Sequence, residues 1–154
     1  MPVRSFRGKI SSYDATVAGS GIDTITLHTN DGSTGYKIVK FQLMQTEPGE
    51  ADGEHIVKIF TIPQTEGTRF VDFADNTLLG AGFTKTDASE IYADTNTVIF
   101  DNMTFNQDIY VTHIDVKAAK PVNYYIELEQ VKLSLDENTV ATLKDIRNIE
   151  AQNV

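Results

Sequence analysis

Cysteine and tryptophan are absent from the chain, and it holds only three histidines. Without cysteine, neither a disulfide framework nor thiol chemistry is available to the protein. A zinc site needs three or four converging ligands, and His28, His55 and His113 are far apart with no second histidine at ligand spacing. We therefore expect no bound metal, and we expect these histidines to lie at the surface of a sheet.

Long apolar runs and an excess of positive charge are also missing. No run approaches the roughly 20 residues of a transmembrane helix, and no apolar segment typical of a signal peptide follows the first basic residues. The formal net charge of -9 disfavours nucleic acid and anionic membranes as partners, because both attract clusters of lysine and arginine. Residues 1–13 are the exception, with Arg4, Arg7 and Lys9 and no acid. This basic segment predicts either an arm that docks on an acidic partner or an ordinary edge strand.

The sequence motifs of common enzyme classes do not occur. The chain contains no G-x-S-x-G, no P-loop and no G-x-G-x-x-G. Residues 46–54 hold four carboxylates, but not in the order of a known calcium loop, so a solvated acidic loop is favoured over a cation site. With 22 acidic residues some carboxylate pair will always be close, yet no pattern selects a glycosidase pair. We therefore predict a non-enzymatic protein with no catalytic residue and no cofactor.

Runs rich in β-branched and aromatic residues alternate with turn signals along most of the chain. Residues 74–90 are expected to be irregular because Gly80 and Gly82 read as turn residues. This pattern predicts an all-β fold, an antiparallel β-sandwich of jelly-roll-like form, built from one domain over residues 1–154. A loosely ordered tail is expected at 148–154. The expected strands are 3–13, 22–29, 36–45, 55–62, 68–73, 97–100, 109–116, 122–135 and 139–147, with a strand or helical turn at 89–93.

The stretch from Phe105 to Leu135 is predicted to be the centre of the fold. Two strands, at 109–116 and from Val122 onward, are separated by the short segment KAAKP, and we expect them to pair as a hairpin. After Leu128 the apolar phase changes, which predicts a β-bulge near Glu129–Gln130 or, alternatively, a strand buried on both faces. The predicted core residues are Tyr110, Ile114, Val116, Val122, Tyr124, Ile126 and Leu128, together with Val39, Phe41 and Leu43.

Several of the predicted strands have a second apolar face. Ile109 and Val111 lie on the side of their strand opposite the predicted core, and a single sandwich buries only one face of each sheet. Because monomers rarely expose a large apolar patch, we expect these two residues to contact another copy of the chain in a homo-oligomer.

The closing segment, FDNMTFNQDIYVTHIDVKAAKPVNYYIELEQVKLSLDENTVATLKDIRN, carries a resemblance to a known family. Residues 96–148 resemble small virion structural proteins of tailed bacteriophages. The resemblance implies a β-rich subunit located in the virion, decorating or cementing the capsid shell, with the major capsid protein or other virion subunits as partners. The alternatives are a tail, baseplate or fibre module that binds a host glycan through exposed tyrosines, and a β-sandwich hydrolase. The tyrosines expected to stack on sugar are Tyr13, Tyr36, Tyr92 and Tyr125.

Overall fold

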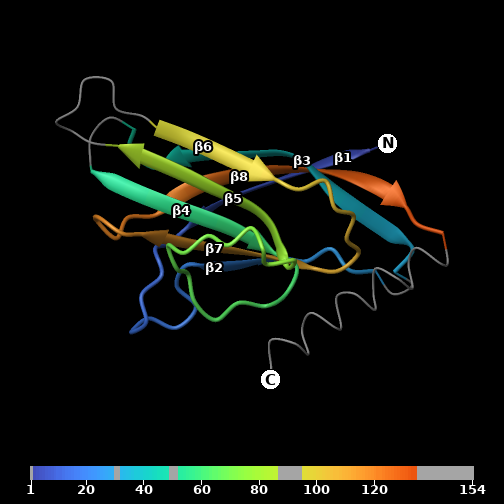
Figure 1. Ribbon diagram of the computed structural model, residues 1–154, viewed down its shortest axis with the longest axis horizontal. Coiled ribbons are helices and arrows are strands. Elements are labelled where there is room, and N and C mark those ends of the chain that lie inside the picture. The colour runs from blue at the N-terminus through green and yellow to red at the C-terminus, as the bar shows by residue number, and fades with distance from the viewer. Residues whose placement is uncertain (1, 30–31, 49–51, 87–94, 135–154) are drawn as a thin grey trace.

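Within the described part of the chain, eight strands form two antiparallel sheets packed face to face (Figure 1). The computed structural model describes residues 2–29, 32–48, 52–86 and 95–134. One sheet has the strand order β1-β8-β3, and the other has the order β2-β7-β4-β5-β6. The all-β antiparallel sandwich is therefore confirmed. The strands are β1 (Val3–Ile10), β2 (Ile22–Ile25), β3 (Thr34–Gln45), β4 (Gly53–Phe60), β5 (Leu78–Thr86), β6 (Thr95–Phe100), β7 (Ile109–Asp115) and β8 (Val122–Lys132).

Some predictions about the chain as a whole are left as they stand. The jelly-roll arrangement and the assignment of residues 1–154 to a single domain stay predictions. The element expected at 89–93, the strand at 139–147 and the tail at 148–154 lie outside the described residues.

Strand β8, at the centre of the three-stranded sheet, shows the predicted alternation. Val122, Tyr124, Ile126 and Leu128 are buried, whereas the residues between them are half-buried. Alternate residues of a strand point to opposite faces, so these four side chains all point into the space between the sheets. Their burial is confirmed. The core that they join includes Ile38, Phe41 and Leu43 from β3 and Val57, Ile59, Ile109 and Val111 from the other sheet.

The predicted hairpin between β7 and β8 is wrong, because the two strands belong to different sheets. Strand β7 pairs with β2 and β4, while β8 pairs with β1 and β3. The chain turns away after Asp115, whose carboxylate accepts hydrogen bonds from the backbone N–H groups of Lys117, Ala118 and Lys120 at 2.9, 3.2 and 3.0 Å. Ala119 adopts a left-handed φ of 54° in the same turn. A short loop with this geometry crosses between the sheets instead of reversing within one.

The two faces of β7 are also the reverse of those predicted. Ile109 and Val111 are 0% exposed and belong to the core, so the prediction that they form an intersubunit surface is wrong. Tyr110 and Ile114 are half-buried and Val116 is 37% exposed, so none of these three has its predicted core position. Both faces of this strand are apolar, and the alternation therefore did not reveal which face points inward.

The second apolar face of the five-stranded sheet is covered by residues 61–77 of the same chain. Ile56, Phe60 and Ile62 are buried, and the buried Lys58 donates hydrogen bonds from Nζ to the Thr68 hydroxyl at 2.9 Å and the Phe70 carbonyl at 2.8 Å. The sequence analysis expected another subunit to cover a second apolar face. In the structure, this loop of the same chain covers it.

Strand β5 lies where irregular structure was expected, and residues 68–73, predicted to be a strand, belong to the covering loop. Gly82 explains why β5 was predicted to be irregular. A Cβ at this position would lie 2.8 Å from Leu43 Cδ1, so the strand needs a glycine where β3 packs closely against it. A glycine selected for close approach looks, in the sequence, like a glycine selected for a turn.

The irregularity in the three-stranded sheet lies in β3 and not in β8. The register between β3 and β8 shifts between Ile38 and Lys40, whereas β8 runs without a shift against β1. Val39 is the extra residue, and it is exposed, so its predicted core position is wrong. The bulge predicted near Glu129–Gln130 is likewise wrong. A bulge on one strand changes the phase relative to its partner, so a phase change read in β8 can reflect a bulge opposite it.

Candidate functional site

The three basic residues of the N-terminal segment lie on a strand and not on a free arm. Arg4, Arg7 and Lys9 are exposed on β1, which pairs with β8 along its whole length and forms one edge of the three-stranded sheet. Arg4 Nη1 lies 3.3 Å from the Tyr36 hydroxyl and donates a hydrogen bond to it. Arg7 and Lys9 make no side-chain hydrogen bond or ion pair with the described residues, which leaves both charges available to an external partner.

Two of the histidines meet inside the protein, so their predicted position at a sheet surface is wrong. His55 Nδ1 lies 2.9 Å from His113 Nε2, the rings stack with centroids 5.1 Å apart, and His113 Nδ1 lies 3.0 Å from the Ser11 carbonyl oxygen. His113 Nδ1 must donate to that carbonyl, so its Nε2 accepts a hydrogen bond from His55 Nδ1. Burial lowers the pKa of His113 to about 4 and also lowers the pKa of His55. These neutral rings are inaccessible to substrate and tie β4, β7 and the Ser11 segment together.

Asp115 lies beside this pair and has a structural role. Burial alone would raise its pKa, but hydrogen bonds from the backbone N–H groups of Lys120, Lys117, Glu54 and Ala118 outweigh burial and hold the pKa below its usual value. The carboxylate is therefore committed to the turn between the two sheets.

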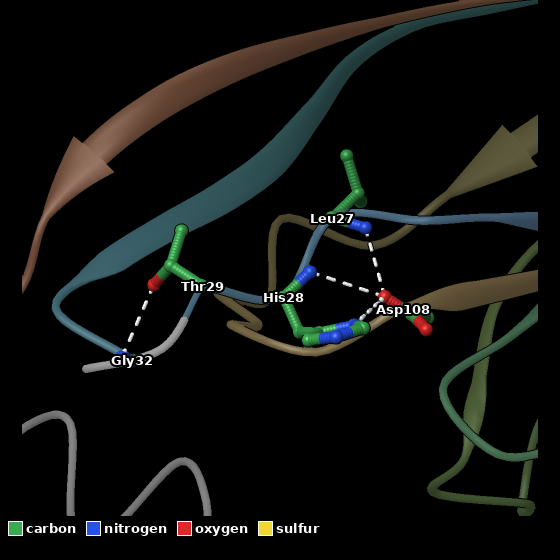
Figure 2. Close-up of polar contacts among 5 residues, drawn as sticks. All are labelled: Leu27, His28, Thr29, Gly32 and Asp108. Carbon is green, nitrogen blue, oxygen red and sulfur yellow. Dashed lines mark hydrogen bonds and ion pairs between the residues drawn. The ribbon is translucent and has the colours of Figure 1, made fainter.

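The remaining histidine forms a pair with Asp108 at the surface (Figure 2). Asp108 Oδ1 accepts hydrogen bonds from the backbone N–H groups of Leu27 and His28 at 2.8 and 3.0 Å and from His28 Nδ1 at 2.7 Å. Burial would raise the pKa of Asp108, but these hydrogen bonds, led by that from the His28 ring, lower it. The pair has the form of a histidine oriented by a carboxylate. However, no described residue forms a hydrogen bond with His28 Nε2, so no nucleophile completes a catalytic set.

The acidic loop uses two of its carboxylates in ion pairs. Glu47 lies 3.8 Å from Lys120, and Glu54 lies 3.8 Å from Lys85; Glu50 falls outside the described residues. Over residues 2–29, 32–48, 52–86 and 95–134, no group of three or more histidine, aspartate or glutamate side chains is placed to hold a metal ion.

Five exposed apolar side chains belong to the covering loop and to β6, the edge strand of the five-stranded sheet. Phe73, Ile99 and Phe100 line a hollow of about 410 Å³, and Phe70 and Val71 precede Phe73 in the same loop. Phe70 is 70% exposed and Phe73 is 66% exposed. We call these five residues the apolar surface. The sequence analysis missed it because TRFVDF was interpreted as a strand, although three large apolar residues in a loop flanked by polar segments were a usable signal.

Two carboxylates lie in the same hollow, and each holds a local turn. Asp75 Oδ1 accepts hydrogen bonds from the Thr77 backbone N–H at 2.9 Å and the Thr77 hydroxyl at 2.6 Å. Asp101 Oδ1 accepts one from the Met103 backbone N–H at 3.0 Å. These local hydrogen bonds give Asp75 and Asp101 a role in forming turns. The two carboxylates therefore do not support the hydrolase alternative.

A second hollow, of about 610 Å³, is lined by Tyr125 and other residues of the three-stranded sheet and by Asn96 and Val98 of β6. The ring is half-buried, and its hydroxyl donates a hydrogen bond to Glu127 Oε1 at 2.7 Å, which fixes its orientation. Of the other tyrosines expected to be exposed, Tyr36 is buried, so that prediction is wrong. Tyr13 is half-buried, and Tyr92 is outside the described residues.

The chain has no significant match to a protein-family model or to a curated protein. In the part of the chain that the structure describes, no helix is long and apolar enough to cross a membrane.

Proposed function

We propose that the protein is a non-enzymatic structural subunit of a bacteriophage virion that decorates or cements the capsid shell. The observation that carries this proposal is the apolar surface. Phe70, Phe73 and Ile99 are each more than half exposed. Phe73 and Ile99 line a hollow into which a partner side chain can insert, and Phe70 lies three residues before Phe73 in the same loop. Exposed apolar residues that gather in one place mark interaction sites, whereas scattered ones do not.

The surroundings of the apolar surface fit a protein interface. Asp75 and Asp101 line the hollow together with Phe73, Ile99 and Phe100, so polar and apolar groups lie together there, as they do in protein–protein contacts. The major capsid protein or another virion subunit is the partner we propose, and a second copy of the chain is the other protein that such a surface would fit. A decoration protein acts by covering and linking shell subunits, which requires a surface of this kind and no reaction.

Replacing both Phe70 and Phe73 with serine is expected to weaken binding to the shell at least tenfold. Fully burying a phenylalanine side chain is worth roughly 1.5–3 kcal/mol, and about 1.4 kcal/mol corresponds to a factor of ten in the dissociation constant. The measurement is co-sedimentation of purified protein with undecorated shells over a concentration series. The double variant Val17→Ser, Val116→Ser is the matched control, because both valines are exposed and lie outside the apolar surface and outside β1. Wild-type protein that stays in the supernatant at micromolar concentration would refute capsid decoration, and sedimentation equilibrium without shells would reveal self-association.

The basic residues of β1 predict a salt dependence for the same binding. If Arg4, Arg7 and Lys9 face acidic groups of the shell, affinity should fall as salt rises, because exposed charges are screened beyond about 8–10 Å at physiological ionic strength. Replacing all three with glutamine should remove most of that dependence in the co-sedimentation assay. The same salt dependence in the triple variant would show that this strand does not contact the shell.

A second candidate function, a tail, baseplate or fibre module that binds a host glycan, is supported by a different observation. Tyr125 lines a hollow whose size is in the range of small-molecule sites, and the other lining residues come from the three-stranded sheet and from β6. Labelling of intact particles distinguishes the two candidates, since a decoration protein is found on heads and a glycan-binding module on tails.

A further inference from the structure

The hollow around Tyr125 combines an aromatic ring with polar side chains that have no partner among the described residues. Gln42, Asn96 and Asn123 line it, and none of these amides forms a side-chain hydrogen bond within the described part of the chain. Arg7 lies on the neighbouring strand directly opposite Tyr125 and lines the same hollow. Arg7 and Gln42 lie opposite Tyr125 on the two neighbouring strands, Asn123 lies two residues before it on β8, and Asn96 of β6 lines the same hollow. Four groups with unused hydrogen-bonding capacity therefore line one hollow with the Tyr125 ring.

These groups match the chemistry of a sugar. An amide side chain donates and accepts hydrogen bonds at once, as a sugar hydroxyl does, so amides can satisfy hydroxyls in either role. The face of a tyrosine ring carries negative charge density and attracts the positively polarised C–H groups of a sugar ring. The orientation of the Tyr125 ring is set in advance by its bond to Glu127, which lowers the entropy lost on binding.

The charges around the hollow select an acidic sugar. No carboxylate is among its lining residues, although the chain as a whole has a net charge of -9. The carboxylate beside it, that of Glu127, accepts the hydrogen bond of the Tyr125 hydroxyl. Arg7 supplies a guanidinium group, whose fork of N–H donors fits a carboxylate with two parallel hydrogen bonds. Lys40 Nζ lies 6.0 Å from the centre of the Tyr125 ring and adds a second positive charge.

We infer that this hollow binds an acidic saccharide, with a sugar ring packed on Tyr125 and a carboxylate paired with Arg7. The inference rests on the second candidate function and names its ligand class. It does not involve the apolar surface, so capsid decoration is tested independently of it.

The test measures the affinity of the whole chain for trigalacturonate and for its fully methyl-esterified form. Both affinities are determined by NMR titration. The esterified probe keeps the rings and removes the charge. Wild-type protein should bind the acidic probe at least tenfold more tightly than the ester. Arg7→Gln should abolish that preference, and Tyr125→Ala should remove binding of both probes. Tyr125→Phe keeps the ring and should retain binding, and Arg69→Gln, which changes an exposed arginine outside the lining of the hollow, should have no effect.

Three outcomes would overturn the inference, and they separate it from the candidate function. Equal binding of both probes that depends on Tyr125 would refute the acidic class while preserving a glycan-binding module. Binding that survives Tyr125→Ala would place the site elsewhere. No binding of either probe, or of a hyaluronan tetrasaccharide, at about 10 mM would refute both the inference and the glycan-binding function, because even weak sites have dissociation constants near the millimolar range.

Discussion

The Ile126→Ala variant is expected to lose about 2–5 kcal/mol of its free energy of unfolding. Ile126 is fully buried at the centre of β8, where it lies opposite Phe6 of β1 and Phe41 of β3. Truncation removes apolar contacts and leaves a cavity that close-packed neighbours fill only in part. Denaturant unfolding measures the loss directly as a lower midpoint at unchanged slope.

Ile99 offers a control with the same chemical change. It is 51% exposed on β6, so its truncation creates no cavity and should cost less than about 0.5 kcal/mol. Similar losses in the two variants would mean that the centre of β8 does not pack as described. A loss below about 0.5 kcal/mol for Ile126→Ala would place that side chain at the surface.

The burial of β8 could be predicted because one of its faces is apolar and the other is polar. Val122, Ile126 and Leu128 alternate with asparagine, tyrosine and glutamate, so only one face can be buried. The sequence of β8 therefore shows which of its faces points into the core. The sequence of β7 does not, since Ile109 and Val111 alternate with Tyr110 and Ile114, and both faces are suited to burial.

Strand pairing and loop cover depend on contacts between distant segments. The turn formed by Asp115 decides that β7 and β8 separate, and its hydrogen bond from the Glu54 backbone N–H, at 3.1 Å, joins segments that no local pattern connects. Lys58 is a similar case. A lysine is rarely buried without a partner, and here the covering loop both buries Lys58 and supplies its hydrogen-bond acceptors.

The candidate sugar site was predictable in parts but not as a whole. Tyr125 was expected to be a stacking residue, and Arg7 was expected to belong to a basic segment. They lie opposite each other because of the register between β1 and β8, which is a property of the folded sheet. The apolar surface was not predicted, because Phe70, Val71 and Phe73 lie in a loop that alternation assigned to a strand.

Acid is expected to destabilise the protein between pH 6.5 and pH 4 through His113. Burial lowers its folded-state pKa to about 4, while the exposed ring in the unfolded chain has the ordinary histidine pKa of 6.5. Because the unfolded state then holds the extra proton, the stability that His113 contributes is fully present above pH 6.5 and is lost as the pH falls towards 4. A shift of this size corresponds to about 3 kcal/mol. His55, whose pKa is lowered in the same direction, adds to the loss.

The difference between wild type and His113→Gln isolates this effect from the other titrating groups. Reducing the net negative charge stabilises the compact state as the pH falls, and both proteins share that contribution. Asp108 and Asp115 have lowered pKa values, so their stability is lost only below the ordinary carboxylate range. The wild type should therefore lose about 1.4 kcal/mol per pH unit more than the variant within the window, measured by urea unfolding. NMR titration of the His113 ring in the wild type gives a readout that does not depend on the variant folding. A midpoint near 6.5, or parallel pH profiles for the two proteins, would show that His113 is not a buried neutral ring and that the hydrogen-bonded chain from His55 to Ser11 is not formed.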